Sequence, residues 1–381
     1  MLKILTVIES LGRAGAEQAL VNLLPALQKR GHQCEVVALW PPYTLATALE
    51  EQGIIVHRFN LRHRWSVLEC HRKLFTLCRR RRFDILHAHL FFPTIYSALT
   101  KIAMPELGRV VSFHNLGYDS YPANRIWKRA RKAGHACLVR HWIDTYAAVS
   151  PQVASHYEMH LGLTDVKVIS NSFPLDTISL DEFPDPATAR RTYSVGEKEF
   201  LVLTPGRLVR EKGHLFLLQA LEILRTRGLY PKVLILGDGP LAVALADEVL
   251  QRNLSDQVIF HKAVPYKDVL LLIRSADAVT VPSIHEGFGL VAMEAMALER
   301  AVLATDVGGL VDLVDNNVSG LLVPPANSSA LAEGLEKLMR DPILRQRLGR
   351  AGREKIVSNF STDIIATRWE NLYREMLEKS K

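Results

Sequence analysis

The chain has 381 residues, of which 48% are hydrophobic and 23% are charged, and its formal net charge is +7 at pH 7. This length suits two domains of ordinary size, and this composition excludes a globally disordered chain and a collagen-like repeat. No stretch approaches the roughly 18 consecutive apolar residues of a membrane span, and the four cysteines include no Cys-x-x-Cys pair.

The first half of the chain predicts a parallel α/β domain. Residues 3–9 are a short apolar run of strand type, a turn with Gly12 and Gly15 follows, and apolar residues then recur at helical spacing over 16–27. With a strand predicted at 35–39, this order forms the βαβ unit of a parallel sheet. Further strands are predicted over 84–89, 109–114, 145–150 and 166–170, and a helix near 94–103.

The second half repeats this alternation after a stretch rich in Pro, Asp and Ser over 172–199. The predicted strands are 200–204, 232–236, 257–260, 278–281 and 301–304, and the predicted helices are 215–227, 242–252 and 289–298. We therefore expect two doubly wound α/β domains facing across a cleft. The expected parts are a first domain over 1–175, a linker over 176–197, a second domain over 198–360, and a helix over 361–381 that packs back on the first domain.

One glycine-bearing loop stands where a predicted strand meets a predicted helix. Residues 282–294 read Pro-Ser-Ile-His-Glu-Gly-Phe-Gly-Leu-Val-Ala-Met-Glu. A helix N-terminus presents free N–H groups and suits a phosphate, and Gly287 and Gly289 let the backbone approach an anionic ligand. Glu286 on the loop and Glu294 in the helix could bind different parts of one ligand. The alternative for Glu294 is a solvated residue on the helix surface.

A second loop, Thr204-Pro-Gly-Arg-Leu-Val-Arg-Glu-Lys-Gly213, follows the first strand of the second domain. Gly206 allows a turn at the carboxyl end of that strand, where α/β sheets bind ligands. Arg207 as a planar fork and Lys212 as a point charge could clamp a diphosphate. The alternative is that both are surface cations on a loop.

Together these motifs resemble the signature of the retaining GT-B glycosyltransferases, a large family that includes bacterial mannosyl-, glucosyl- and N-acetylhexosaminyltransferases and sucrose synthases. The matching C-terminal motifs are Gly206-Arg-Leu-x-x-x-Lys-Gly213, Gly237-Asp-Gly-Pro240, Glu286-Gly-Phe-Gly-Leu-x-x-x-Glu294 and Gly308-Gly309. The N-terminal landmarks are Gly15-Ala-Glu17, Asp84-Ile-Leu-His-Ala-His89 and Ser112-Phe-His114. The resemblance spans nearly the whole chain.

The resemblance implies a role for each matching residue. Arg207 and Lys212 would bind the diphosphate of a nucleotide-sugar and stabilise it as it leaves, with Gly206 in the same loop, and Glu294 would hold the ribose hydroxyls. Glu286 would hold sugar hydroxyls and the distal phosphate, together with the backbone of Gly287, Phe288, Gly289 and Leu290. From the first domain, His114 would lie near the sugar and Gly15 near the phosphate.

The resemblance also implies the reaction: a retaining hexosyl transfer to a hydroxyl of a glycan or lipid-linked acceptor, in envelope polysaccharide or glycolipid synthesis. We expect no cofactor and no metal, because Arg, Lys and a helix N-terminus can neutralise the leaving group and no Asp-x-Asp ends a strand.

Three histidines admit two interpretations. His87 and His89 lie two apart on a strand and so share one face. They could begin a zinc site, but no third ligand is evident, and the resemblance favours His89 as a residue that lines the cleft. For His285, beside Glu286, we expect a solvent-facing loop position.

The chain departs from the family pattern at four places. Ala14 precedes Gly15 where the family has a second glycine, and Lys262 stands where a glycine often follows a strand, which leaves the base of the nucleotide open. Glu299-Arg-Ala-Val302 replaces Gly-x-Pro-Val, and Asp312 replaces a common Glu. None of these changes removes a charged residue of the motifs.

The positive charge lies in the first half of the chain. Residues 1–170 hold 22 Lys and Arg against 12 Asp and Glu, whereas the remainder holds 25 against 28. The basic segments 62–64, 79–82 and 125–132 lie near aromatic residues in the sequence, which suits an anionic membrane surface, the alternative being solvated helix faces. No motif for reading nucleic acid is present. We expect a cytoplasmic protein, peripheral on the inner face of the membrane, whose N-terminus is a buried strand and not a signal peptide.

Other functions on the same architecture stay open. A catalytically silent nucleotide-sugar-binding subunit would fit the altered first loop and Lys262. A nucleotide-sugar epimerase would need its own acid and base carboxylates near the sugar. A dehydrogenase is disfavoured because the first loop has Gly12 and Gly15 but no full Gly-x-Gly-x-x-Gly.

Overall fold

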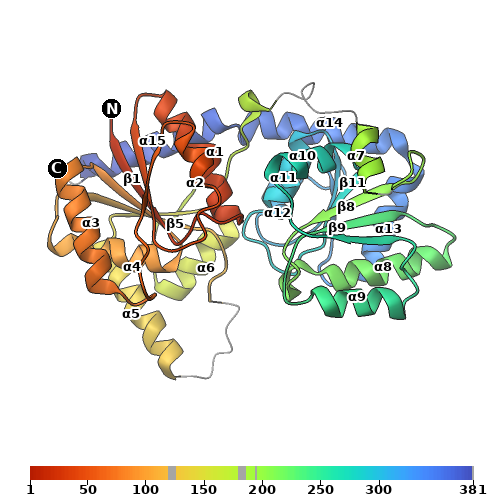
Figure 1. Ribbon diagram of the computed structural model, residues 1–381, viewed down its shortest axis with the longest axis horizontal. Helices are drawn as coiled ribbons and strands as arrows, with labels where there is room; N and C mark the ends of the chain where they lie inside the picture. Colours follow the sequence, from red (N-terminus) through yellow and green to blue (C-terminus); the bar gives the residue numbers. More distant parts are fainter. Residues whose placement is uncertain (119–125, 179–185, 194, 380–381) are drawn as a thin grey trace. The chain divides into compact units, whose positions relative to one another are not determined.

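A computed structural model of the chain describes residues 1–118, 126–178, 186–193 and 195–379. The chain divides into two compact units, unit 1 with Met1–Pro174 and Thr362–Lys381, and unit 2 with Leu175–Ser361. Each unit has a parallel sheet flanked by helices (Figure 1). Among the described residues, none of the helices combines the length and the apolar character that crossing a bilayer requires.

Unit 1 contains a seven-stranded parallel sheet in the order β3-β2-β1-β4-β5-β6-β7. Parallel strands that helices cover on both faces are apolar along their whole length, and in β1 only Lys3 is not fully buried. The strands are β1 (Lys3–Ile8), β2 (Gln33–Ala38), β3 (Ile55–Arg58), β4 (Ile85–His89), β5 (Gly108–Phe113), β6 (Thr145–Ala148) and β7 (Lys167–Val168). The helices are α1 (Gly15–Lys29), α2 (Ala46–Glu50), α3 (Val67–Arg81), α4 (Phe91–Leu99), α5 (Ile126–Trp142), α6 (Pro151–Leu161) and α15 (Thr362–Lys379).

The C-terminal helix α15 completes unit 1 although it comes from the far end of the chain. It packs against α1, and its apolar face enters the same core as β1, β2 and β4. Glu370 on this helix accepts hydrogen bonds from Arg30 at 3.0 Å and from His32 at 2.7 Å. The buried carboxylate and the apolar face together fix α15 to the end of α1.

Unit 2 contains a six-stranded parallel sheet in the order β10-β9-β8-β11-β12-β13. The strands are β8 (Leu201–Pro205), β9 (Lys232–Leu236), β10 (Val258–His261), β11 (Ala278–Val281), β12 (Ala301–Thr305) and β13 (Leu321–Val323). The helices are α7 (Pro186–Thr192), α8 (His214–Thr226), α9 (Ala242–Gln251), α10 (Tyr266–Ser275), α11 (Leu290–Ala297), α12 (Leu310–Leu313), α13 (Ser328–Arg340) and α14 (Pro342–Asn359).

The strand order reverses once in each sheet, between β1 and β4 in unit 1 and between β8 and β11 in unit 2. In such sheets the loops at the carboxyl ends of the two central strands run to opposite sides, and the crevice between them is where ligands bind. The predicted site loops, Gly206 to Gly213 and Pro282 to Gly289, follow the two central strands of unit 2.

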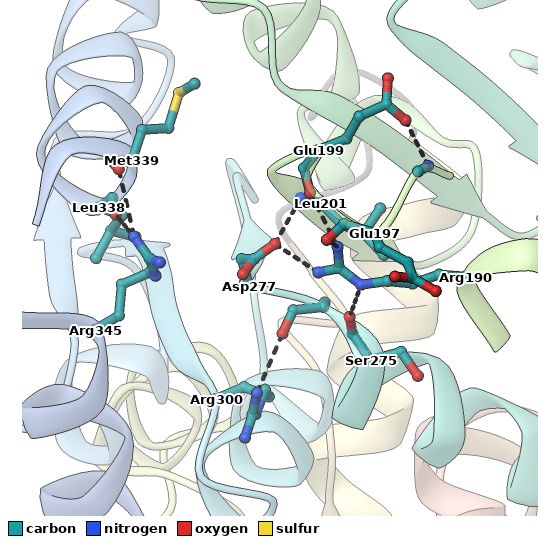
Figure 2. Close-up of polar contacts among 12 residues, drawn as sticks. Arg190, Glu197, Glu199, Leu201, Ser275, Asp277, Arg300, Leu338, Met339 and Arg345 are labelled. Carbon is teal, nitrogen blue, oxygen red and sulfur yellow. Dashed lines mark hydrogen bonds and ion pairs between the residues drawn. The ribbon is translucent and has the colours of Figure 1, made fainter. Parts of the chain in front are cut away.

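The segment 176–197, predicted to be a linker, contains helix α7, which packs against α10 of unit 2. Arg190 on α7 holds this packing (Figure 2). Its guanidinium donates to the carbonyl of Ser275 at 2.9 Å, to the carbonyl of Glu199 at 2.9 Å and to the carboxylate of Asp277 at 2.6 Å. Asp277 also accepts from the backbone N–H of Leu201 at 2.9 Å, so one ion pair joins α7 to the starts of β8 and β11.

We expect Arg190→Ala to lower the free energy of unfolding of unit 2 by about 3 kcal/mol, because it leaves the Asp277 carboxylate without its cation in a partly buried place. Arg191→Ala is the matched control, since its ion pair with Glu197 is mostly exposed. Chemical denaturation of both variants checks the prediction, and equal losses in the two would contradict it.

Candidate functional site

The loop after β8 bends back against the loop after β11 at one glycine. Gly213 has φ +66°, and a Cβ there would lie 1.9 Å from the carbonyl oxygen of Pro282. Only glycine therefore allows this close approach. The approach is reinforced because the carbonyl of Glu211 accepts a hydrogen bond from the N–H of Ile284 at 2.7 Å.

An ion pair links the same two loops. Lys212 Nζ lies 2.7 Å from Glu286 Oε2, which also accepts a hydrogen bond from Ser283 Oγ at 3.1 Å. Both charged side chains are mostly buried, with 25% of Lys212 and 14% of Glu286 exposed. Lys212 and Glu286, 74 residues apart in sequence, are thus in direct contact.

Helix α11 begins at the end of the second loop with its N–H groups uncapped. Its N-cap residue is Gly289, with φ +100°, which has no side chain to accept from the first turn. A Cβ on Gly289 would lie 2.5 Å from Leu310 Cδ2, which makes glycine necessary here too. Phe288 is buried behind the loop, and the first turn of α11, starting at Leu290, can accept an anion.

Arg207 and Gly206 precede the ion pair in the first loop. Arg207 is exposed, and no ion pair of its guanidinium occurs in the described part of the chain. Gly206 does not have a positive φ, and a Cβ there would come no closer than 3.8 Å to Lys212. The prediction that the turn needs glycine at position 206 is therefore wrong within unit 2, and the residue of this loop that must be glycine is Gly213.

Glu294 lies inside α11 and points inward. It is 5% exposed, which rules out the alternative of a solvated helix residue. Burial raises the pKa of its carboxyl to about 8, and a hydrogen bond with the side chain of Tyr266 opposes that shift. A buried carboxyl of this kind is suited to a polar ligand, because a hydroxyl group can replace the water it has lost.

We expect Glu294 to make unit 2 less stable as the pH rises. The pKa of Glu294 in the folded protein, about 8, exceeds the ordinary value of 4.5. The protonated carboxyl therefore stabilises the folded state fully below pH 4.5, and this contribution is lost as the pH rises through 8. Glu294→Gln should flatten this decline, whereas the exposed Glu333→Gln should not. Thermal unfolding over this range measures the effect, and parallel curves for Glu294→Gln and the natural protein would contradict it.

Unit 1 has a buried histidine cluster at the carboxyl ends of β4 and β5. His89 Nδ1 lies 2.8 Å from His114 Nε2, and His87 bonds to Ser112 Oγ at 2.7 Å and to Tyr373 of α15 at 2.8 Å. Burial lowers the pKa of His114 to about 4 and that of His87 to about 3, and the pKa of His89 also falls well below its ordinary value. All three are therefore neutral at pH 7 and act as hydrogen-bonding groups.

A small cavity of about 20 Å³ adjoins this cluster, enough for about one water molecule. His89 and His114 line it together with residues of β5, α1, α15 and the segments after β6 and β7: Ser112, Ala19, Leu20, Leu23, Ile365, Trp369, Val149, Ile169, Ser170, Asn171 and Ser172. His89 is 2% exposed, so it lines this cavity and not an open surface. The described residues include no group of three or more His, Cys, Asp or Glu placed to hold a metal ion.

The remaining predicted residues take simple positions. Gly15 is the exposed first residue of α1, whose N-cap residue, Ala14, has no side chain that could cap it. His285 is exposed on its loop, as expected. Three features of the site were not predicted: Ser283 as a partner of Glu286, Tyr266 beside Glu294, and the direct bond between His89 and His114. Only Ser283, three residues before Glu286, could have been suspected from spacing.

Two family models match the chain. Residues 13–177 match "Glycosyltransferase Family 4", and residues 187–355 match "Glycosyl transferases group 1". A glycogen synthase of Mycobacterium tuberculosis is 31% identical over 300 residues, covering 77% of this chain and 69% of that protein. An O-antigen chain mannosyltransferase C of Escherichia coli is 26% identical over 376 residues, covering 96% and 95%.

Among solved structures, Anabaena HepE in complex with UDP-glucose superimposes with a TM-score of 0.84 at 20% identity, covering 98% of this chain and all of that one. Two α/β domains, each with a parallel sheet whose strand order reverses once, make up the GT-B fold. The predicted fold class, two Rossmann-type domains, is confirmed.

Proposed function

Because the chain belongs to the group 1 glycosyl transferases, we propose that it transfers a sugar from a nucleotide-diphosphate sugar to a hydroxyl group of an acceptor. The observation that carries this proposal is the meeting of the loops after β8 and β11 in unit 2. There the Lys212–Glu286 pair lies at the carboxyl edge of the sheet, in the loop that leads into the uncapped start of α11.

In this proposal unit 2 stabilises the departing diphosphate. As the bond between the anomeric carbon and the phosphate oxygen breaks, negative charge grows on the diphosphate. Lys212 and Arg207 supply fixed positive charge, and the N–H groups of α11 supply hydrogen bonds. Because these groups belong to the chain, we propose that the reaction needs neither a divalent cation nor a cofactor.

The remaining residues orient the donor. Glu286 is held by Lys212 and Ser283, so its second oxygen is available to sugar hydroxyls. Glu294 accepts hydrogen bonds from the ribose hydroxyls, which replace the water that burial has removed from its carboxyl. His114, neutral and bonded to His89, presents a ring nitrogen to the sugar, and Gly15 leaves the start of α1 open to phosphate.

We further propose that the transferred group is a hexose, that the reaction retains anomeric configuration, and that the acceptor is a glycan or a lipid-linked glycan of the cell envelope. The O-antigen mannosyltransferase, which matches over almost the whole chain, supports this acceptor class. The basic character of residues 1–170 supports an acceptor at the inner, cytoplasmic face of an anionic membrane.

Thermal unfolding in the presence of UDP-, GDP-, ADP- and TDP-sugars tests the donor. A ligand at one hundred times its dissociation constant should add about 2.7 kcal/mol of stability. One nucleotide-sugar should raise the melting temperature, and Arg207→Ala should reduce that rise. If none of the panel stabilises the protein, the proposal fails. Stabilisation without release of nucleotide would indicate a silent binding subunit, and conversion of the donor without acceptor would indicate an epimerase.

A further inference from the structure

The positive charge of unit 1 is concentrated in one short stretch. Residues 58–82, which include the loop after β3 and helix α3, contain nine Lys and Arg residues and a single acidic residue, Glu69. Figure 1 shows α3 as an outer helix of unit 1. The excess of cations over 1–170 therefore lies mostly on one surface element.

Two large apolar side chains are exposed among these cations. Trp65 is 62% exposed and Leu68 is 86% exposed. Trp65 is also held in place, because its ring packs edge-on against Phe92 at 5.3 Å. Apolar side chains that are this exposed have no role in the core of unit 1.

The outward face of α3 continues this pattern. Leu68, Arg72, Thr76 and Arg79 follow one another at intervals of four, four and three residues, and all are exposed. The opposite face carries Cys70, Leu74 and Cys78, which are buried against the sheet. Helix α3 is therefore amphipathic: its inner face is apolar and buried, and its outer face carries cations. Trp65 and Leu68, at the start of the helix, add two exposed apolar side chains to that outer face, here called the apolar tip.

Several of these cations form no close ion pair in the part of the chain that the structure describes. Arg58 pairs with Glu50, Lys73 with Glu69, and Arg81 lies 3.5 Å from Glu35. Within the described ranges, by contrast, no ion pair involves the exposed residues Arg62, Arg64, Arg72 and Arg79. Glu69 and Glu9 lie near enough to act electrostatically on Arg62, Arg72 and Arg64, but these two carboxylates do not balance the nine cations of the stretch, which leaves positive charge for an external anion.

Trp65 and Leu68, the apolar tip, lie at the edge of the unit 1 sheet where the strands have their carboxyl ends. Helix α3 begins just after the carboxyl end of β3, and Trp65 contacts Phe92, three residues beyond His89 at the end of β4. The carboxyl ends of parallel strands share one edge of the sheet. Trp65 and Leu68 consequently lie on the same edge as the His89–His114 pair.

We propose that Arg62, Arg64, Trp65, Leu68, Arg72 and Arg79, here called the α3 surface, dock unit 1 on an anionic lipid bilayer. The arginines bind lipid phosphates, and Trp65 and Leu68 enter the boundary between headgroups and acyl chains. A nucleic acid would use the arginines but would leave an aliphatic side chain such as Leu68 in water. The purpose of docking, to bring the site to a lipid-linked acceptor, rests on the proposed function, whereas the docking itself does not.

Sedimentation with vesicles tests this surface without donor or acceptor. The natural protein should bind vesicles of equimolar phosphatidylcholine and phosphatidylglycerol, should not bind vesicles of phosphatidylcholine alone, and should be released by salt. The triple variant Arg62→Gln, Arg64→Gln, Arg72→Gln should bind the anionic vesicles about 100-fold more weakly, since each basic residue near such a surface contributes about a fivefold factor. The double variant Trp65→Ala, Leu68→Ala should lose at least about tenfold.

A matched control comes from unit 2. Ile343 and Arg347 on α14 are exposed at the same four-residue spacing as Leu68 and Arg72, so the double variant Ile343→Ala, Arg347→Gln should bind as the natural protein does. Equal binding to both kinds of vesicle, no binding to either, or unchanged binding by the arginine variant would overturn the proposal. Displacement of the vesicles by a DNA duplex at equal charge concentration would also overturn it, in favour of nucleic acid. Donor-induced stabilisation of the same preparation reports separately on the transferase proposal.

Discussion

Replacing Lys212 by alanine should lower the rate of nucleotide release from the donor by about 100- to 1,000-fold, the loss typical when one preorganised group that meets developing charge is removed. Lys212 is the cation that bridges the loops after β8 and β11, and its partner Glu286 would be left as an uncompensated, mostly buried carboxylate. Initial rates at saturating donor, measured as released nucleoside diphosphate, check the prediction.

The matched control is Arg210→Ala. Arg210 belongs to the same short 3₁₀ turn, Arg210–Lys212, but its side chain is exposed. It should keep a rate within a few fold of the natural protein. If both variants lose activity equally, the effect belongs to the fold of the loop and not to the charge of Lys212.

Replacing Trp369 by alanine should lower the free energy of unfolding of unit 1 by about 3–5 kcal/mol, as is usual for a buried tryptophan. Trp369 is 5% exposed on α15, lies in the main core of unit 1 and contacts the ring of His87 at 4.6 Å between centroids. Because it also lines the cavity beside His89 and His114, donor turnover should fall as well. Denaturant unfolding followed by circular dichroism measures the stability.

Trp65→Ala provides the comparison for this loss. It removes the same side chain from the same unit, but from a position that is 62% exposed. Its cost should stay below about 1 kcal/mol, as for surface substitutions in general. A small effect of Trp369→Ala would mean that α15 is not needed to complete the core of unit 1.

The repeated βαβ pattern was predictable because fully buried parallel strands are continuous apolar runs. The runs at β8 and β11 are apolar except for one threonine each, and β1 adds only Lys3 and Thr6, so the pattern is easily recognised. Strand β3, Ile-Val-His-Arg, was not predicted because it is short and ends in polar residues. Helix α7 was not predicted either, because its Pro-bearing sequence is weak on its own and Arg190 holds it by contacts that are distant in the chain.

The site was predictable in its residue types and only partly in its geometry. Spacing placed Glu286 on a loop and Glu294 in a helix, but not the inward direction of Glu294, because α11 is apolar on nearly every side. The Lys212–Glu286 pair depends on the close backbone approach that glycine allows at position 213, which no local pattern encodes. The His89–His114 bond follows from the pairing of β4 with β5, where His89 lies opposite Ser112.

Amide hydrogen exchange with and without the stabilising nucleotide-sugar tests the central claim most directly, because it locates the donor on the chain. The donor should slow exchange at the backbone N–H groups of residues 206–213 and 286–292, which belong to the two loops and the start of α11. Protection confined to other parts of the chain, from a ligand that does raise the melting temperature, would contradict the placement of the donor in unit 2.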